Sequence, residues 1–357
     1  MRKIAALLLV MVMVFAFAAC NKSSTPPASS GGSSSSGSSG SGSSTPAAPS
    51  GGGDQKVFYW IGKVPGGGYW SGVEAGLRGA AEEFDLDVRM FGIERETDVE
   101  RQVNLLADAV SAKPDAILIA PCDSNALAKP VQEAHAAGIP IILVDTKIAA
   151  DDGFTAAILT NNIQAGKTCA KLLADFLKAD GKTKGYVGVL VASTGSQTAN
   201  DRMDGFREYW EKEANLPDVT VLWDEIKVSD GDATKAISSV KDMMTKYGDE
   251  LVGFFGGTGD SVNIGNAMRE TGNKDVVVVG MDFNVDSHSR LSEGFMRGSC
   301  AQQTYKMGYE GCKLALAAID GKTFEGDDKF IDSGLLPITM DNIDSDEVKL
   351  ILDLINR

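Results

Sequence analysis

Two neighbouring aromatic residues follow a run of glycines where a strand pattern gives way to a helix pattern. Tyr69 and Trp70 stand in the segment VPGGGYWSGVEAG. A phosphate-binding loop would need Lys and Ser or Thr after its last glycine, so this segment is not one. Aromatic rings can instead pack on a small ring whose faces are apolar and whose rim is polar, and the glycines allow close approach. The alternative is that one or both rings belong to the hydrophobic core.

Two aspartates stand directly after apolar strand patterns. Asp145 follows IPIILV and Asp282 follows VVVVGM. An ionised carboxylate at the end of such a strand is costly unless it is paired or solvated. A carboxylate can accept hydrogen bonds from two adjacent hydroxyl groups, and charge-assisted bonds are roughly twice as strong as neutral ones. Both residues are therefore candidates for binding a polyhydroxylated molecule. The alternative is that each caps the N-terminus of a helix.

Catalytic and metal-binding chemistry finds little support in the sequence. The two histidines, His135 and His288, lack metal-ligand spacing, and there is no G-x-S-x-G motif. Asp145 and Asp282 could form the carboxylate pair of a glycosidase, but no feature of the sequence indicates a raised pKa for either. We therefore expect no catalytic residue, no metal and no cofactor.

Strand and helix patterns alternate along the chain and position these residues. Continuous apolar runs such as DAILIA are typical of strands buried on both faces of a parallel sheet. Strands are expected at 56–62, 87–91, 115–120, 139–144, 156–160, 186–192, 219–226, 251–256 and 275–281. Helices are expected at 71–84, after a capping box at 97–100, at 124–137, 163–179, 198–214, 233–247, 261–271 and 304–320. Two successive βαβ series predict two doubly wound, Rossmann-like α/β domains, whose ligands bind at the carboxyl ends of strands.

The N-terminus has the pattern of a bacterial export signal. Arg2 and Lys3 precede the apolar run 4–19, which is short for a membrane span of about 20 residues. The ending Ala18-Ala19-Cys20 resembles a lipobox, although Phe17 stands where Leu is usual. We expect residues 1–20 to be a signal peptide and Cys20 to carry the lipid anchor; plain secretion is the alternative.

A low-complexity segment separates the signal from the folded part. Residues 21–53 are almost entirely Ser, Gly, Thr, Pro and Ala, a composition that has nothing to bury. As a flexible tether they would span roughly 30 Å. The remaining length favours two domains. The net charge of −15 excludes a general affinity for nucleic acid or anionic lipid.

Four further cysteines could in principle pair outside the cytoplasm. Four cysteines allow three pairings, but a chain of this size needs no disulfide to fold. Two of them fall within helix patterns, which favours buried thiols. We expect no disulfide among these residues, which are Cys122, Cys169, Cys300 and Cys312.

Seven segments follow one another along the chain in a characteristic order: GGGYWSGVEAGLRGAAEE, PDAILIAPCDSNAL, AGIPIILVDT, TNNIQAGK, TANDRMDGF, DVVVVGMDFN and AQQTYKMGYEG. Through these segments the chain from 57 to 336 resembles the type 1 periplasmic binding proteins, in particular the ribose- and galactose-type sugar-binding group. This resemblance implies two parallel-sheet domains joined by a multi-strand hinge, with the ligand in the cleft between them. Proteins of this family bind solutes for ABC importers and are not enzymes.

The resemblance also implies which residues contact the ligand. The family's paired aromatics match Tyr69 and Trp70, and its two aspartates match Asp145 and Asp282. Its cleft arginine matches Arg202, for which a surface ion pair is the alternative, and its crossover glutamine matches Gln302, for which hinge packing is the alternative. The full predicted ligand-binding set is Tyr69, Trp70, Asp145, Thr146, Asn162, Arg202, Asp282 and Gln302.

The sequence departs from the ribose-binding pattern at several polar positions. Thr146 stands where ribose binders carry arginine, and Gly67, Ala120 and Gly259 stand where they carry asparagine. These changes disfavour ribose as the ligand. Two predicted carboxylates against one cation also disfavour an anionic ligand, because its charge would be repelled in a poorly solvated cleft. A neutral sugar or polyol is the expected ligand.

The resemblance and the termini together predict a lipid-anchored, extracytoplasmic binding protein that delivers a neutral sugar or polyol to an ABC permease. We expect a monomer that closes around its ligand. One lobe would comprise 54–161 plus 303–332 and the other 162–302 plus 333–357, with hinges near Asn161, Gln302 and Ile331. A subunit of a chemotaxis or sensor receptor is an alternative. A lactose-type repressor is excluded because a signal and a tether stand where its helix-turn-helix would be.

Overall fold

The computed structural model describes residues 55–66 and 68–355. The predicted signal peptide, the predicted lipid attachment site Cys20 and the predicted tether 21–53 lie outside this part of the chain. Among the described residues, no helix combines the length and apolar character that crossing a bilayer requires.

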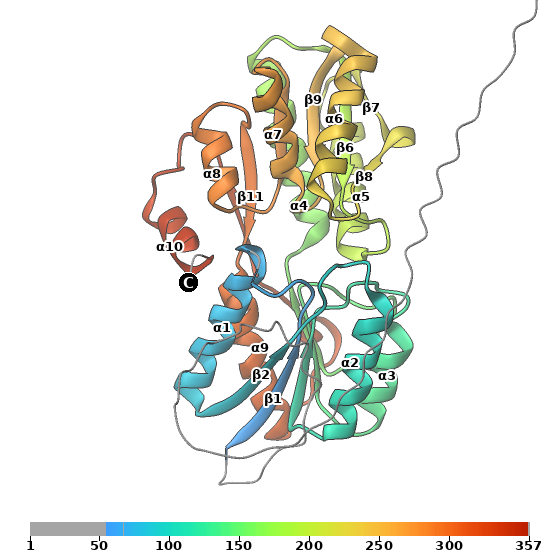
Figure 1. Ribbon diagram of the computed structural model, residues 1–357, viewed down its shortest axis with the longest axis vertical. Coiled ribbons are helices and arrows are strands. Elements are labelled where there is room, and N and C mark those ends of the chain that lie inside the picture. The colour runs from blue at the N-terminus through green and yellow to red at the C-terminus, as the bar shows by residue number, and fades with distance from the viewer. Residues whose placement is uncertain (1–54, 67, 356–357) are drawn as a thin grey trace, which may run out of the picture. The chain divides into compact units, whose positions relative to one another are not determined.

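The first sheet has six parallel strands, which are covered by helices on both faces (Figure 1). Along β1, Phe58 and Trp60 face one helix pair, whereas Tyr59 and Ile61 face the other, so this part of the strand is buried on both faces. The strands are, in sheet order, β12 (Phe330–Asp332), β5 (Ala156–Leu159), β4 (Ile141–Val144), β3 (Ala116–Ile119), β1 (Lys56–Ile61) and β2 (Leu86–Phe91). One face is covered by α1 (Gly68–Phe84) and α9 (Thr304–Ile319), the other by α2 (Val99–Ala112) and α3 (Ala128–Ala136).

The second sheet is parallel except at one edge, where β13 runs antiparallel to β11. Its strands are, in order, β13 (Leu335–Ile338), β11 (Gly298–Gln302), β10 (Val277–Met281), β9 (Leu251–Gly256), β6 (Lys184–Val191) and β7 (Asp218–Val221), with β8 (Lys227–Val228) also pairing with β6. One face is covered by α4 (Asn162–Ala179) and α5 (Gln197–Lys212), the other by α6 (Ala233–Tyr247), α7 (Ser261–Thr271) and α8 (Val285–Ser292). The last helix is α10 (Asp346–Ile355). We call the first sheet with its helices the N-lobe and the second the C-lobe.

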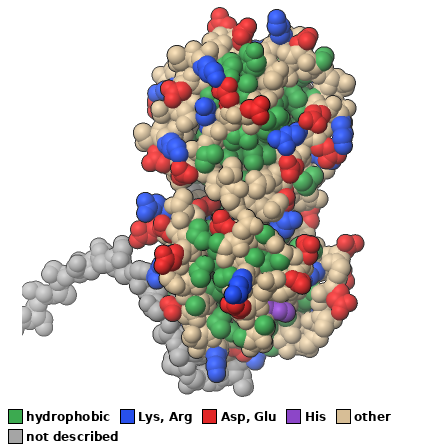
Figure 2. Space-filling model, turned by 90° about the vertical axis from the view of Figure 1, so that its right-hand side faces the viewer, with side chains coloured by type: hydrophobic (Ala, Val, Ile, Leu, Met, Phe, Trp, Pro, Cys, Tyr) green, Lys and Arg blue, Asp and Glu red, His purple; other side chains and the backbone are tan. Residues whose placement is uncertain are grey.

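The chain passes between the two sheets three times, between β5 and α4, between β11 and α9, and between β12 and β13. The predicted class, two doubly wound α/β domains joined by several crossovers, is confirmed. On the face shown in Figure 2, acidic and basic side chains are interspersed and form no continuous basic patch.

A close helix pair in each lobe depends on glycine. A Cβ on Gly76 of α1 would lie 2.0 Å from the carbonyl oxygen of Tyr305 in α9, and one on Gly166 of α4 would lie 2.0 Å from that of Arg202 in α5. Only glycine permits these approaches. The pair α4 and α5 thereby brings Arg202 beside the start of α4, where it meets Asn162.

Three local expectations were wrong. The capping box at 97–100 does not form: Asp98 is the N-cap of α2, and its carboxylate accepts the Arg95 N–H at 3.2 Å instead of a helix N–H. The helix expected from 124 begins only at Ala128. The Asp123 side chain accepts the N–H groups of Asn125 and Ala126 and forms a turn before the helix. The strand expected at 219–226 ends at Val221 and gives way to a short 3₁₀ helix.

Candidate functional site

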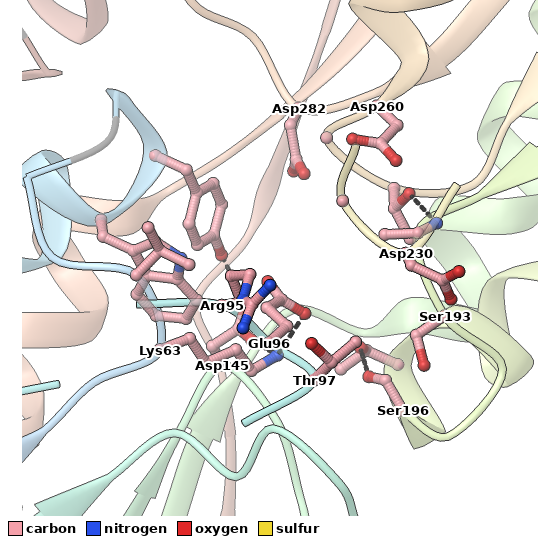
Figure 3. A pocket seen from close by; sticks show the side chains of 18 of the residues that line it. Lys63, Arg95, Glu96, Thr97, Asp145, Ser193, Ser196, Asp230, Asp260 and Asp282 are labelled. Atoms are coloured by element: carbon pink, nitrogen blue, oxygen red, sulfur yellow. Dashed lines mark hydrogen bonds and ion pairs between the residues drawn. The ribbon is translucent and has the colours of Figure 1, made fainter. Parts of the chain in front are cut away.

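A cavity of about 560 Å³ opens at the carboxyl ends of the strands and is lined from both lobes. In Figure 3, Asp282, Asp260 and Asp230 approach it from one side, and Lys63, Glu96 and Asp145 from the other. The N-lobe contributes the residues after β1, β2 and β4 and the start of α1. The C-lobe contributes the residues after β6, β8, β9 and β10, and Gln302 ends β11.

Six of the eight predicted ligand-binding residues line this cavity: Tyr69, Trp70, Asp145, Arg202, Asp282 and Gln302. Thr146 and Asn162 lie behind it. Thr146 donates its hydroxyl to Asp145 at 2.5 Å, and Asn162 accepts the Arg202 Nε–H at 2.8 Å. These two residues therefore orient lining side chains instead of lining the cavity themselves.

The aromatic pair serves both the cavity and the core. Trp70 is only 7% exposed and packs against Trp60 and Tyr69, with ring centroids 6.2 and 5.0 Å apart. Tyr69 is half-buried and directs its hydroxyl into the site. Both readings of the sequence, core and cavity wall, thus apply to Trp70.

The carboxylate of Asp145 is held on both oxygens. Tyr69 donates to Oδ1 at 2.6 Å, Thr146 donates to Oδ2, and Lys63 Nζ lies 3.5 Å from Oδ2. Burial alone would raise the pKa of Asp145, but the Lys63 charge and the two hydroxyl donors outweigh it, so that pKa is lowered. Asp145 is thus kept ionised in a nearly water-free position.

Lys63 is a site residue that the sequence analysis missed. It is 4% exposed, and its Nζ also lies 3.0 Å from Thr146 Oγ1 and 3.8 Å from Glu96 Oε2. Burial opposes its charge, but Glu96 and Asp145 outweigh burial and raise the pKa of Lys63. The sequence could have indicated Lys63, because it stands two positions after a buried strand and so lies, like Asp145, at the carboxyl ends of the strands of the sheet.

Asp282 is less well compensated than Asp145. Gln302 Nε2 donates to Oδ1 at 2.6 Å, and no Lys or Arg of the described chain lies within ion-pairing distance of its carboxylate. Burial raises the pKa of Asp282, and the more distant Arg202 opposes this only in part. The oxygen Oε1 of Gln302 is buried without a hydrogen-bond partner. This wall of the cavity therefore has unused acceptor capacity.

The structure excludes the alternative roles considered for Arg202, Asp145 and Asp282. Arg202 is 4% exposed and donates to Asn162 and to the Gly257 carbonyl oxygen, so it is not in a surface ion pair. Asp282 does not cap a helix, since Asn284 is the N-cap of α8. Asp145 likewise caps none of the described helices, because its carboxylate accepts from side chains alone.

The rim of the cavity is acidic. The sequence analysis assigned no role to the charged residues of this rim, which are Glu94, Arg95, Glu96, Asp230, Asp232 and Asp260. The Ser229 hydroxyl donates to Asp260, whose pKa is raised by burial. Seven carboxylates and three basic side chains line the cavity: Glu94, Glu96, Asp145, Asp230, Asp232, Asp260 and Asp282 against Lys63, Arg95 and Arg202.

No set of three or more His, Cys, Asp or Glu side chains within 55–66 and 68–355 is arranged to hold a metal ion. The groups that line the cavity are hydrogen-bond donors, acceptors and aromatic faces. Chemically, the arrangement suits the reversible binding of a small molecule that has many hydroxyl groups.

Comparison with known proteins agrees with this geometry. The family model described as periplasmic binding protein domain matches residues 58–323. A ribose import binding protein of Bacillus subtilis is 25% identical over 228 residues, 64% of this chain and 69% of that protein. A D-allose-binding periplasmic protein of Escherichia coli is 26% identical over 267 residues, 70% of this chain and 80% of that protein. A carbohydrate transporter solute-binding protein of Agrobacterium radiobacter, solved with D-arabinose, has a TM-score of 0.77 at 30% identity and covers 84% of this chain and 99% of its own.

The fold and the site define a two-lobed binding protein, and the chain belongs to the periplasmic binding protein family. It is an extracytoplasmic solute-binding protein of the type that serves sugar ABC importers, as the sequence predicted.

Proposed function

We propose that the protein captures a neutral sugar or polyol in the 560 Å³ cavity and delivers it to an ABC permease. The observation that carries the proposal is the meeting of Tyr69 and Trp70 with Asp145 and Asp282 around one cavity. An aromatic face packs on the C–H groups of a sugar ring, and the carboxylates accept its hydroxyl protons. The sugars named for its relatives, ribose, allose and arabinose, are all neutral.

The polar groups of the cavity favour hydroxyl groups over charged ones. Gln302 Oε1 and the unpaired oxygen of Asp282 are free to accept hydroxyl protons. Lys63 can donate to a ligand oxygen, but its charge is already shared by Asp145 and Glu96. A phosphate or carboxylate would add negative charge to a cavity in which seven carboxylates already face three basic side chains.

The proposed mechanism is closure of the two lobes around the ligand. A ligand that touches Tyr69 in the N-lobe and Asp282 in the C-lobe stabilises the conformation in which both contacts are made. The three crossovers, near Asn161, Gln302 and Ile331, would act as hinges. Lipid attachment at Cys20, the tether 21–53 and a monomeric state complete the proposal, in which the protein binds its solute without chemical turnover.

A thermal-shift screen of the mature protein with sugars and polyols tests this proposal. The panel should contain ribose, allose, arabinose and sugar alcohols, together with amino acids as a different ligand class. At least one neutral sugar or polyol should raise the Tm, since ligand binding stabilises the folded state by mass action. The proposed ligand class would be wrong if only amino acids raised the Tm, or if none of the sugars and polyols raised it.

A further inference from the structure

Two cysteines of the C-lobe are in direct contact although they are far apart in the sequence. Cys169 lies on α4 and Cys300 on β11, and their sulfur atoms are 3.4 Å apart. Both side chains are fully buried, and Met281 Sδ lies 3.7 Å from Cys169 Sγ. Cys122 and Cys312 are also buried, but they belong to separate clusters of the N-lobe core. Geometry therefore distinguishes this one pair from the other combinations of the four cysteines.

We propose that Cys169 and Cys300 form a disulfide as the protein folds outside the cytoplasm. A disulfide bond is about 2.05 Å long, so the two sulfur atoms must approach by roughly 1.4 Å. Rotation about the two side-chain bonds can supply part of this, and the compartment in which the protein resides permits disulfides. The sequence analysis predicted no disulfide, and the structure holds both residues as buried free cysteines. The proposal departs from that expectation because only the fold brings together a cysteine of a helix and a cysteine of a strand that are more than a hundred residues apart.

The bond requires a disulfide oxidant, either a protein disulfide or a small-molecule disulfide such as oxidised glutathione. The thiolate of one cysteine attacks the oxidant, which forms a mixed disulfide and releases one reduced thiol. The thiolate of the other cysteine then attacks the sulfur of the first, which closes the bond and releases the second reduced thiol. The protein loses two electrons and two protons, and the oxidant gains both.

The surroundings determine when this reaction can occur. A hydrogen bond to Cys300 and burial raise the pKa of the Cys169 thiol well above its ordinary value, so the folded protein contains little of the reactive thiolate. Oxidation therefore precedes completion of the C-lobe core. Once formed, the bond is protected from reductants by the same burial.

The cross-link would lie directly behind the cavity. The carbonyl oxygen of Cys300 accepts the Asp282 N–H at 2.9 Å, and Gln302 follows on the same strand. Cys169 lies on the helix whose first residue, Asn162, holds Arg202. A bond between α4 and β11 thus fixes the two elements that orient these cavity residues.

Peptide mapping of the exported full-length protein tests the proposal. The protein is denatured in the presence of N-ethylmaleimide, which alkylates free thiols, and in the absence of reductant. It is then digested with trypsin. We expect peptides 168–171 and 298–306 to be recovered as one linked species, which separates after reduction. Cys122 and Cys312 should be alkylated and serve as internal controls. Recovery of alkylated Cys169 and Cys300 from the exported protein would overturn the proposal.

Two single substitutions sharpen this test. Cys169→Ala should leave Cys300 available to N-ethylmaleimide, whereas Cys312→Ala should leave the linked species unchanged. Reduction in mild denaturant should lower the Tm of the Cys312→Ala protein but not that of Cys169→Ala. Equal responses of the two variants to reduction would contradict the cross-link.

Discussion

Asp145 in the N-lobe and Asp282 in the C-lobe occupy equivalent positions in their sheets. Each is the first residue after a buried parallel strand, and each has a φ of 66°, in the left-handed region that Asp tolerates better than most residues. The N–H of each donates at 2.9 Å to the neighbouring strand, Asp145 to the Ile158 carbonyl oxygen and Asp282 to that of Cys300. The backbone therefore presents the two carboxylates to the cavity in the same way.

Their partners differ. Asp145 accepts hydrogen bonds from Tyr69 and Thr146 and lies beside Lys63, whereas Asp282 accepts one hydrogen bond from Gln302. The pKa of Asp145 is consequently lowered and that of Asp282 raised. In the N-lobe wall, both oxygens of Asp145 thus have partners before ligand binds. In the C-lobe wall, Asp282 can still accept a hydrogen bond from a ligand hydroxyl. Asp145 should matter more for stability and Asp282 more for binding.

Removing the cation of the N-lobe wall should have the largest effect. Lys63→Met would leave Asp145 buried without its charge partner, and breaking a buried ion pair costs roughly 3 kcal/mol or more in the free energy of unfolding. Urea denaturation of the ligand-free protein measures this cost. Lys129→Met is the control, since Lys129 is highly exposed and pairs only with Glu133 on the surface. A loss no larger than that of the control would show that Asp145 does not depend on Lys63.

Neutralising the C-lobe carboxylate should affect binding more than stability. Asp282→Asn removes a charged acceptor of ligand hydroxyls, and a hydrogen bond to a charged group contributes about 2 kcal/mol, or roughly thirtyfold in Kd. Calorimetric titration with the sugar identified by the screen measures the change. Asp286→Asn, an exposed position on α8, is the matched control and should bind as the wild type does. Unchanged affinity in Asp282→Asn would remove this residue from the binding site.

The hydroxyl of Tyr69 contributes a smaller amount to the N-lobe wall. Tyr69→Phe keeps the ring but removes the 2.6 Å bond to Asp145, and should cost about 1.5 kcal/mol of unfolding free energy. Tyr305→Phe is the comparison, because the hydroxyl of Tyr305 has no hydrogen-bond partner in the described part of the chain. Equal stability of the two variants in urea denaturation would place the Tyr69 hydroxyl outside the network.

The two aspartates should also respond oppositely to pH. The lowered pKa of Asp145 gives stability that is present above the ordinary value of 3.8 and is lost as the pH falls below it. The raised pKa of Asp282 means that stability is lost as the pH rises through and above 3.8. As the pH is raised from 3 to 7, the free energy of unfolding of Asp145→Asn should therefore fall relative to that of the wild type. That of Asp282→Asn should rise relative to the wild type. Parallel curves in urea denaturation at these pH values would contradict the assigned directions.

The sequence predicted the fold and the positions of the main polar groups because both depend on local patterns. A strand pattern followed by Asp places a carboxylate at the carboxyl end of the strand. This pattern was enough to predict the positions of Asp145 and Asp282. Contacts between distant segments were not accessible in the same way. Lys63 lies near Asp145 only because β1 pairs with β3 and β3 pairs with β4. Thr146 holds Asp145 and does not line the cavity.

Local competition between hydrogen bonds explains the error at the predicted capping box. Thr97 to Glu100 has the composition of a capping box with Thr97 as its N-cap, but Asp98 accepts the N–H of Arg95 and is the actual N-cap of α2. This frees Thr97 to line the cavity beside Glu96. The capping motif therefore located the start of the helix to within one residue but assigned the wrong residue as its N-cap.

Calorimetric titration with a matched pair of ligands tests the central claim, a binding site for a neutral polyhydroxylated molecule, most directly. The neutral sugar that gives the largest shift in the screen, for example D-arabinose, is compared with its phosphate ester under identical conditions. With seven carboxylates and three basic side chains around the cavity, the ester should bind at least about a hundredfold more weakly, which corresponds to roughly 2.7 kcal/mol. Equal or tighter binding of the phosphate ester would contradict the account.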